Sequence, residues 1–309
     1  MTGYRAKLVQ LDNREQWLQE RRAGAFRIGA SSVAPILGAS PYRGPWGVYN
    51  AHHGDESKAR PGDPKAFARG HALEEVALRL YELETDQSCT HYDNAIAVSE
   101  SAPWAICSPD ASVDSDGGLV EIKTGRDLEA WGEAGEIPQW TGEAETRVPV
   151  WYAFQCYWQR LITRAPYVDL VWLRPFYDLR IYRLWPDERI ESALLRRVGD
   201  WRERHLVAQQ WPSVDGSKTC GLHIAERHGD PSKTLRRATE EEEALGRTLA
   251  AARADEKQAH QAAEYCGNAL RKLIGDDHGI EVPGAGKITW ARKAGTRGTL
   301  RTTIKAERS

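Results

Sequence analysis

Residues 104–123 constrain the fold of this chain more than any other stretch. Two short apolar runs flank Asp116-Gly117-Gly118, a turn sequence in which glycine can take a positive φ, so the stretch predicts a β-hairpin. The second run, residues 119–123, places Glu121 and Lys123 on one face because the side chains of a strand alternate. The hairpin therefore presents an acidic and a basic group side by side.

The other end of this hairpin carries Ser108-Pro109-Asp110. Two carboxylates, Asp110 and Glu121, can hold a hard divalent cation through oxygen, and the ammonium group of Lys123 can orient or deprotonate an attacking water. Each motif alone is weak, because Glu-x-Lys is usually a solvated charge pair and Ser-Pro-Asp usually a turn. Apolar residues between the charges indicate a strand with a buried face, where charged groups are costly without a task. Together they favour metal-assisted phosphodiester hydrolysis.

Composition sets the class of protein. The 309 residues, with 41% apolar and 28% charged residues, suffice for one large globular domain with an appendage, or for two domains. The net charge of −2 gives no overall basic field, so nucleic-acid binding would need a local basic patch. Five scattered cysteines without a C-x-x-C pair argue against structural zinc and iron–sulfur clusters, and suit a reducing compartment. Without an apolar leader or membrane span, we expect a cytoplasmic protein.

Two predicted helices carry further candidate site residues. Residues 65–84 have a helical apolar stripe, and Glu74 lies beside it. The simplest interpretation of Glu74 is an exposed surface glutamate. Its side chain can reach the metal only if this helix packs against the hairpin. Residues 148–162 form a helix dense in aromatic residues, in which Gln155 needs a partner because a buried amide must be satisfied.

The stretch from residue 28 to residue 38 predicts a tight turn into a helix capped by Ser31 or Ser32. The amides and hydroxyls of such a helix start could hold a phosphate. A simple N-cap role for Ser31 is the better interpretation of this stretch by itself.

The sequence predicts three regions. Residues 1–212 form the α/β domain, and residues 213–237, with several glycines and prolines, form a linker. Residues 238–309 form a C-terminal arm, in which Thr239 to Ile274 is a long helix or coiled coil. A small β segment follows it.

With these parts assembled, residues 14–211 resemble the lambda-exonuclease, or YqaJ-like viral recombinase, family of the PD-(D/E)xK nuclease superfamily. Five short blocks match in order: Trp17-Leu18-x-x-Arg21 with Ile28-Gly29-Ala30-Ser31 and Gly38; Arg69-Gly70-His71-Ala72-Leu73-Glu74; Ser108-Pro109-Asp110; Glu121-Ile122-Lys123-Thr124; and Tyr152-x-x-Gln155. This resemblance implies a restriction-endonuclease-like core, with a central mixed sheet flanked by helices, plus the C-terminal helical appendage.

The resemblance also implies roles. Asp110, Glu121 and the Ile122 carbonyl would hold a metal, Glu74 would hold a second one directly or through water, and Lys123 would position the nucleophilic water. Four residues resemble those that bind the terminal 5′ phosphate in the family: Arg21, Ser31, Ser108 and Gln155. The cofactors would be Mg²⁺ or Mn²⁺, two per active site.

The activity that the resemblance implies is digestion of one strand of duplex DNA in the 5′→3′ direction. This leaves a 3′ overhang for a single-strand annealing protein in phage-type recombination. The expected setting is a phage or prophage protein in a bacterial host, as a homo-oligomer, a trimer by resemblance. Two alternatives stay open: a structure- or site-specific endonuclease on the same core, and a non-catalytic module that binds DNA ends.

Three departures from the family pattern matter. Ala111 replaces the glycine that usually follows Ser-Pro-Asp, and Arg69 replaces an aromatic residue before the helix glycine. An insertion before Ser31 leaves open whether Arg21, Arg22 or Arg27 binds the phosphate.

Overall fold

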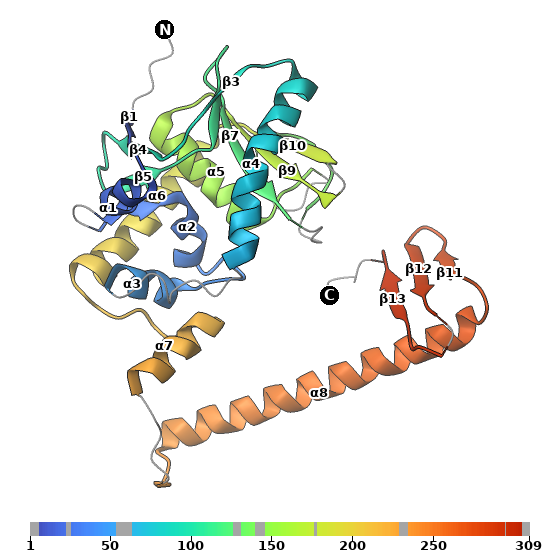
Figure 1. Ribbon diagram of the computed structural model, residues 1–309. Coiled ribbons are helices and arrows are strands. Elements are labelled where there is room, and N and C mark those ends of the chain that lie inside the picture. The colour runs from blue at the N-terminus through green and yellow to red at the C-terminus, as the bar shows by residue number, and fades with distance from the viewer. Residues whose placement is uncertain are drawn as a thin grey trace. The chain divides into compact units, whose positions relative to one another are not determined.

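The structure is a computed structural model that describes residues 6–22, 26–53, 64–125, 131–139, 146–175, 178–228, 234–293 and 295–304. The chain divides into two compact units, Met1–Pro231 and Ser232–Ser309, which are described separately (Figure 1). No helix within the described residues is long and apolar enough to cross a membrane.

A mixed six-stranded sheet forms the centre of the first unit, in the order β3-β6-β7-β9-β10-β8. Its strands are β3 (Cys89–His91), β6 (Ala111–Val113), β7 (Leu119–Thr124), β8 (Gly135–Ile137), β9 (Val168–Leu173) and β10 (Leu179–Leu184). The pairs β7–β9 and β10–β8 are parallel and the other pairs antiparallel. Parallel neighbours need a crossover, and between β7 and β9 the chain passes through α5 (Val150–Thr163).

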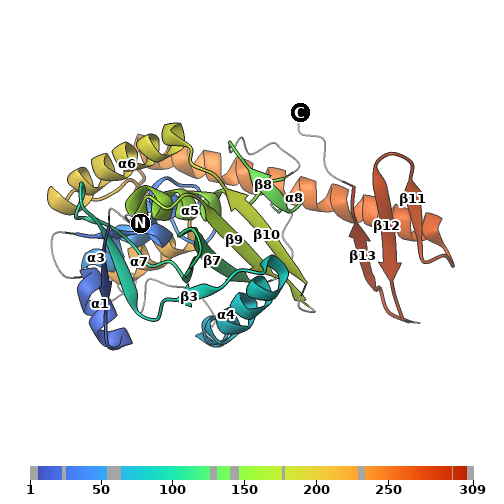
Figure 2. The same cartoon turned by 90° about the horizontal axis from the view of Figure 1, so that it is seen from above.

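Helices cover both faces of this sheet, as the view in Figure 2 shows. On one face α4 (Pro64–Thr85) packs Ala77 and Tyr81 against a cluster that contains Val120 and Ile122 of β7. On the other face α5 packs against a cluster that contains Leu119 of the same strand. The alternation along β7 therefore directs its odd-numbered side chains, including Glu121 and Lys123, to the α5 side.

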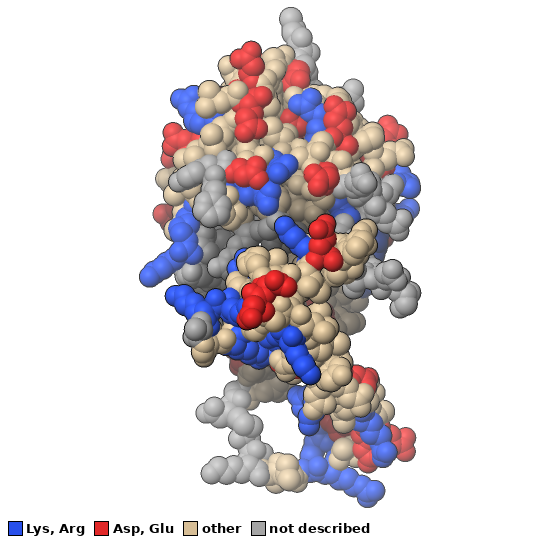
Figure 3. Space-filling view, turned by 90° about the vertical axis from the view of Figure 1, so that its right-hand side faces the viewer, with Lys and Arg blue, Asp and Glu red and all other residues tan. Residues whose placement is uncertain are grey.

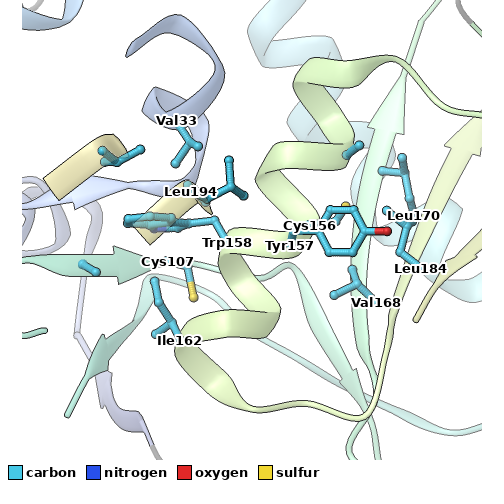
Figure 4. Close-up of a cluster of buried hydrophobic side chains, with 14 of the residues drawn as sticks. Val33, Cys107, Cys156, Tyr157, Trp158, Ile162, Val168, Leu170, Leu184 and Leu194 are labelled. Carbon is cyan, nitrogen blue, oxygen red and sulfur yellow. The ribbon is translucent and has the colours of Figure 1, made fainter. Parts of the chain in front are cut away.

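The larger core lies around α5 (Figure 4). Trp158, Tyr157 and Ile162 of this helix are almost fully buried, and they lie among apolar residues of the strands and of other helices. The periodicity of the aromatic stretch thus predicted a helix, and the structure contains one at nearly the expected bounds. Burial of this size anchors α5 rigidly beside β7.

A second sheet of four strands, in the order β1-β4-β5-β2, flanks the core. Its strands are β1 (Ala6–Gln10), β2 (Ile28–Gly29), β4 (Ala95–Ser99) and β5 (Ala105–Cys107). The helices α1 (Arg14–Arg22), α2 (Ala30–Ile36) and α3 (Pro45–His53) accompany it, and α2 packs against α5. Since β5 belongs to this sheet and β6 to the central one, the stretch 108–110 connects the two sheets.

The predicted hairpin is present as the antiparallel pair β6–β7, with Ala111 opposite Val120. Gly117 takes a φ of 78°, which its lack of a Cβ allows. Gly118 is required for space instead, because a Cβ there would lie 2.2 Å from the ring of Tyr167. The Tyr167 hydroxyl donates to the carboxylate of Asp116 at 2.9 Å, which holds the ring over the turn.

We expect Gly118→Ala to lower the free energy of unfolding by about 1–3 kcal/mol, the usual cost of forcing an extra carbon into a packed site. The matched control is Gly216→Ala, because nothing lies within 4 Å of a Cβ at Gly216. Chemical denaturation of the two variants checks the difference. Equal stability of both would contradict the argument from Tyr167.

A buried charge network holds the centre of the sheet together. Asp169 of β9 is 0% exposed, and Arg183 of β10 donates to both of its oxygens at 2.8 Å. The hydroxyl of Tyr81 on α4 donates to the same carboxylate at 2.6 Å, and burial followed by this carboxylate raises the pKa of Tyr81. Satisfied in this way, the buried charge ties α4 to two central strands.

The end of the first unit differs from the sequence prediction. The helix α6 (Glu188–Arg202) continues as a short π-helical turn over Glu203–Val207. Within the segment predicted as a linker, 213–237, the structure contains the helix α7 (Lys218–His228), which packs against α3. The linker prediction is wrong for residues 218–228, which form this helix. The helix has no clear sequence pattern, because the residues that it buries, Thr219, Cys220 and His223, do not form an apolar stripe. The division into regions otherwise stays a prediction.

The second unit consists of one long helix and a small sheet. The helix α8 (Glu240–Ile274) begins with a capping box, in which Thr239 and Glu242 bond each other's backbone amides. The antiparallel sheet β11-β12-β13 follows it, with β11 (Gly279–Val282), β12 (Gly286–Ala291) and β13 (Thr299–Thr302). A C-terminal helical appendage was therefore correctly predicted.

Candidate active site

The hairpin brings the two carboxylates together as its pattern predicts. Asp110 lies just before β6, and its Oδ2 accepts a hydrogen bond of 2.6 Å from the backbone amide of Ile122 on β7. This bond crosses from one strand to the other, so it fixes Asp110 beside the middle of β7. Glu121 is the residue before Ile122, and its side chain is on the α5 face of the sheet.

Glu121 is only 2% exposed, yet its carboxylate is well satisfied. The ammonium group of Lys123 and the amide of Gln155 both donate to Oε1. The amide of Gln159 donates to Oε2 at 2.5 Å. A carboxylate has about four acceptor positions, so these three donors leave room for one more partner, on Oε2.

One face of α5 supplies these donors. Tyr152, Gln155 and Gln159 are three and four residues apart and so lie on one side of the helix. The ring of Tyr152 lies 5.4 Å from the Lys123 ammonium, which it can stabilise by a cation–π interaction. Sequence reasoning correctly required a partner for Gln155, and that partner is Glu121.

Gln159 was missed by the sequence analysis, although its spacing of four from Gln155 was a usable signal. It is 0% exposed, and its Oε1 accepts no hydrogen bond within the described part of the chain. An unsatisfied buried acceptor costs about 1–3 kcal/mol, which a leucine of similar size would avoid. The other end of the same amide, Nε2, donates to Glu121, which gives this buried glutamine a function in the site.

The electrostatics of the site reflect crowded negative charge. Burial, and next the carboxylate of Glu121, raise the pKa of Asp110 well above its usual value. Glu74 contributes to the same rise, whereas Lys123 and the Ile122 amide oppose it. Burial alone would lower the pKa of Lys123, but Glu121 and Asp110 outweigh it and hold the pKa above its ordinary value. The lysine therefore stays cationic in this arrangement.

Glu74 approaches from the opposite side. It lies on α4, one turn after Gly70, where a Cβ would stand 3.4 Å from Thr124 Oγ1 of β7. The glycine thus lets the helix come close to the strand. The Glu74 carboxylate is bonded to His71 Nδ1 at 2.8 Å, and it influences the pKa of Asp110 across the site.

The donor set fits a hard divalent cation. Within the described ranges, no three side chains of His, Cys, Asp or Glu are grouped so that they could hold one ion. Two carboxylates, Asp110 and Glu121, with a backbone carbonyl between them are nevertheless the oxygen ligands that Mg²⁺ and Mn²⁺ prefer. Burial, and next the Glu121 carboxylate, disfavour the charged form of Asp110 and raise its pKa, and a cation between the two carboxylates would favour that charged form.

The structure describes only some of the side chains that were predicted to bind a phosphate. The side chains of Arg21 and Arg22 lie outside the described residues, whereas Arg27 donates to the Glu20 carbonyl at 2.9 Å and pairs with its carboxylate. Ser108 Oγ accepts from Trp17 Nε1 at 3.1 Å.

The predicted cap of α2 is wrong. The extended residue Gly29, at the end of β2, is the N-cap of α2, and no side chain caps the helix. The helix starts directly from a paired strand, so Ser31 falls inside its first turn, where it is exposed. It is therefore free of a capping role, and its part in phosphate binding stays a prediction.

We expect Gln159→Leu to weaken the affinity for Mn²⁺ by about 10–100-fold, the usual effect of removing a group that orients a metal ligand. Calorimetric titration of the metal checks this. If Gln159 acts only through Glu121, a high metal concentration should restore most of the activity of the variant. Unchanged metal affinity, or a loss of activity that persists at saturating metal, would contradict the positioning role.

Comparison with known proteins shows which family the part of the chain around this site is similar to. Residues 16–166 match the YqaJ-like viral recombinase domain, a range that includes Glu74, Asp110, Glu121, Lys123 and Gln155. No match was found among the curated proteins.

Several solved structures are similar in part. An alkaline exonuclease from Laribacter hongkongensis shares 18% identity over 68% of this chain and 100% of its own, with a TM-score of 0.44. Its complex with dAMP gives the same identity and coverage, with a TM-score of 0.46. A phage-related exonuclease from Haemophilus somnus shares 12% identity over 62% of this chain and 100% of its own, with a TM-score of 0.41.

The matched range begins in α1 and ends just before β9, so it contains the whole hairpin and the helix that satisfies Glu121. The blocks that suggested the family from the sequence all lie inside it. Residues 16–166 of the first unit therefore match the YqaJ-like viral recombinase domain, the family that the sequence motifs resemble.

Proposed function

We propose that this protein is a divalent-metal-dependent deoxyribonuclease that degrades one strand of duplex DNA from a 5′ end. The product would be a 3′ overhang for a single-strand annealing protein in phage-type recombination. One observation supports the chemistry above all: Asp110 and Glu121 converge at the hairpin, and the Lys123 ammonium donates to the Glu121 carboxylate. The polarity and the product rest on the family that the sequence motifs resemble.

In this proposal Asp110, Glu121 and the Ile122 carbonyl hold the metal, and Glu74 assists directly or through water. A bound Mg²⁺ or Mn²⁺ supplies Lewis-acid stabilisation of the charge that develops on the phosphate and on the leaving 3′ oxygen. Gln155 and Gln159 keep the Glu121 carboxylate in one orientation. Their bonds also leave an oxygen position of Glu121 available for the cation.

Lys123 acts as a fixed cation. Because the neighbouring carboxylates keep its pKa high, it stays protonated and can donate hydrogen bonds but cannot act as a base. We propose that it orients the attacking water by hydrogen bonding and stabilises negative charge in the transition state. Arg21, Ser31, Ser108 and Gln155 would bind the terminal 5′ phosphate, and Gln155 would do so while it contacts Glu121.

The test is digestion of linear duplex DNA, labelled on one strand and bearing either a 5′ phosphate or a 5′ hydroxyl, with Mg²⁺ or Mn²⁺. Covalently closed circles are treated in parallel. Release of mononucleotides from the 5′ end, faster with the phosphate and absent from circles, is the expected result. Nicking of circles would favour the endonuclease alternative instead. No cleavage with either metal would leave a DNA-end-binding module.

Biological context is part of the proposal. All five cysteines are free, which suits the reducing cytosol of a bacterial host. DNA ends and an annealing protein are the proposed partners. A homo-oligomer, as the resemblance implies, would let several subunits surround the duplex.

A further inference from the structure

Residues 282–304 of the sequence are unusual in charge. They contain Lys287, Arg292, Lys293, Arg297 and Arg301 but no aspartate or glutamate, although the whole chain has a net charge of −2. All five of these basic side chains are exposed. They lie on β12, on β13 and in the loop between these strands. Figure 3 shows Lys and Arg side chains, with some Asp and Glu side chains among them, on the face of the molecule that is at the right in Figure 1.

Two of these cations hold the hairpin itself in place. Arg292 donates to the backbone carbonyls of Gly275 at 2.6 Å and Asp277 at 3.0 Å, and it lies 4.1 Å from the ring centre of Trp290. Arg297 forms an ion pair with Glu264 of α8. These contacts hold the loop of the β12–β13 hairpin near the end of the long helix.

The remaining cations are available to a partner. Lys287, Lys293 and Arg301 form no ion pair within the described residues. Lys287 lies opposite Glu281 of the edge strand, so its charge is partly offset. Arg301 lies opposite Thr289, so no acidic residue faces it across the strands. Lys293 lies in the loop that follows β12. We call Lys293, Arg301 and Thr289 the hairpin surface.

The sheet has two different faces. Ile288 is buried, so the side chains at alternate positions, Lys287 and Thr289, are on the opposite, outer face. The register places Arg301 on that outer face with Thr289, and Thr299 with Ala291. Guanidinium, ammonium and hydroxyl groups are the donors that contact phosphate oxygens in protein–DNA complexes.

The same geometry argues against binding of single strands by base stacking. Such binding needs an open aromatic ring. Trp290, the aromatic residue of this hairpin, is half-buried, its ring is covered by Arg292, and its Nε1 donates to the Arg297 carbonyl at 2.9 Å. A basic, hydroxyl-bearing face without an open ring is suited to the phosphate backbone of a duplex.

We propose that the C-terminal sheet is a second DNA contact, which binds the phosphate backbone of duplex DNA through the hairpin surface independently of sequence. This inference rests on the proposed function, because it takes DNA as the polyanion that the protein meets. It gives the C-terminal unit a task that the catalytic residues of the first unit do not perform: retention of the duplex while its end is processed.

The experiment measures binding of the full-length protein to a short, blunt, fluorescently labelled duplex without divalent metal, over a series of NaCl concentrations. The test variant is Lys293→Gln/Arg301→Gln. The matched control is Arg253→Gln/Lys257→Gln, which removes the same two side-chain types from the exposed surface of α8. Circular dichroism of all proteins verifies that the fold is retained.

Each phosphate contact contributes about 0.9 to the slope of log K against log salt concentration. The test variant should therefore show a slope smaller by about 1.8, and an affinity lower by roughly 10–100-fold near physiological salt. The control variant should bind as the wild type does. Equal losses in both variants would indicate only a general charge effect and would overturn the proposal, as would no loss in the test variant.

Two further arms separate the possible failures. Wild-type affinity for a poly-glutamate peptide that is lost in the test variant, with DNA binding unchanged, would assign the surface to an acidic protein and overturn the proposal. Cleavage assays with Mg²⁺ are run on the same proteins. Absence of cleavage in the wild type, together with the expected loss of salt dependence in the test variant, would refute the nuclease activity but support the DNA contact.

Discussion

Replacing Lys123 with methionine is expected to reduce cleavage of linear duplex DNA by roughly 10²–10⁴-fold, the range that a positioned catalytic group or electrostatic donor contributes. Methionine has a similar length and no charge, so packing beside Tyr152 is preserved. The Lys123 side chain is 21% exposed, and its ammonium group contacts both Glu121 and the ring of Tyr152. A water that attacks a phosphate near Glu121 would need a donor at this position.

The measurement is the single-turnover rate with saturating Mg²⁺, together with binding of DNA ends without metal. End binding should be retained in Lys123→Met, because its effect is on the reacting atoms. Lys257→Met, on the exposed surface of α8, is the matched control and should cleave at the wild-type rate. Cleavage by Lys123→Met at the wild-type rate would remove Lys123 from the mechanism.

Replacing Asp110 with asparagine is expected to reduce cleavage at least about 10²-fold, since a metal contributes several kcal/mol to the transition state and each 1.36 kcal/mol is tenfold. The same substitution is not expected to lower the stability of the metal-free protein. The pKa of Asp110 is raised in the fold, first by burial and then by Glu121, so its charged form is disfavoured there. A carboxyl group with a raised pKa costs stability as pH rises from its unfolded pKa to its folded pKa.

At neutral pH the uncharged asparagine should therefore leave the metal-free protein at least as stable as the wild type. Asparagine can still accept the hydrogen bond from the Ile122 amide, so the local structure is kept. Mg²⁺ at about 100 times its Kd should stabilise the wild type by about 2.7 kcal/mol but not the variant. Thermal unfolding with and without Mg²⁺ measures both effects.

Asp178→Asn, which removes an exposed carboxylate paired with Arg174, is the control and should keep the full response to Mg²⁺. An equal Mg²⁺ response in Asp110→Asn would place the metal elsewhere. Lower stability of the metal-free variant would contradict the interpretation of the raised pKa.

Local patterns predicted much of the fold because they depend on neighbours in the sequence. The stripe of α4, the aromatic run of α5 and the start of α8 at Thr239 are all periodic or capping signals, and the structure contains each helix within a few residues of the expected bounds. The turn at Asp116 likewise fixed the β6–β7 hairpin, since the glycines permit it locally.

Other elements were missed because their signals are weak or non-local. The short strands β1, β2 and β4 are stabilised by pairing with distant segments, such as Ala6 with Ser99, and such pairings leave no local pattern. The helix α7 buries Thr219, Cys220 and His223 rather than an apolar stripe, so the stretch resembled a linker. Gly29 displaced Ser31 from the cap of α2 because a paired strand runs directly into that helix.

The sequence by itself determined that Asp110, Glu121 and Lys123 share one hairpin, because strand alternation and turn formation act over a few residues. Only the tertiary structure decided that α5 brings Gln155 and Gln159 onto Glu121, across 34 and 38 residues of sequence. Which helix face meets a strand depends on how the whole core packs, and this core buries Trp158 and Tyr157 against the sheet and so turns the glutamines toward the carboxylate.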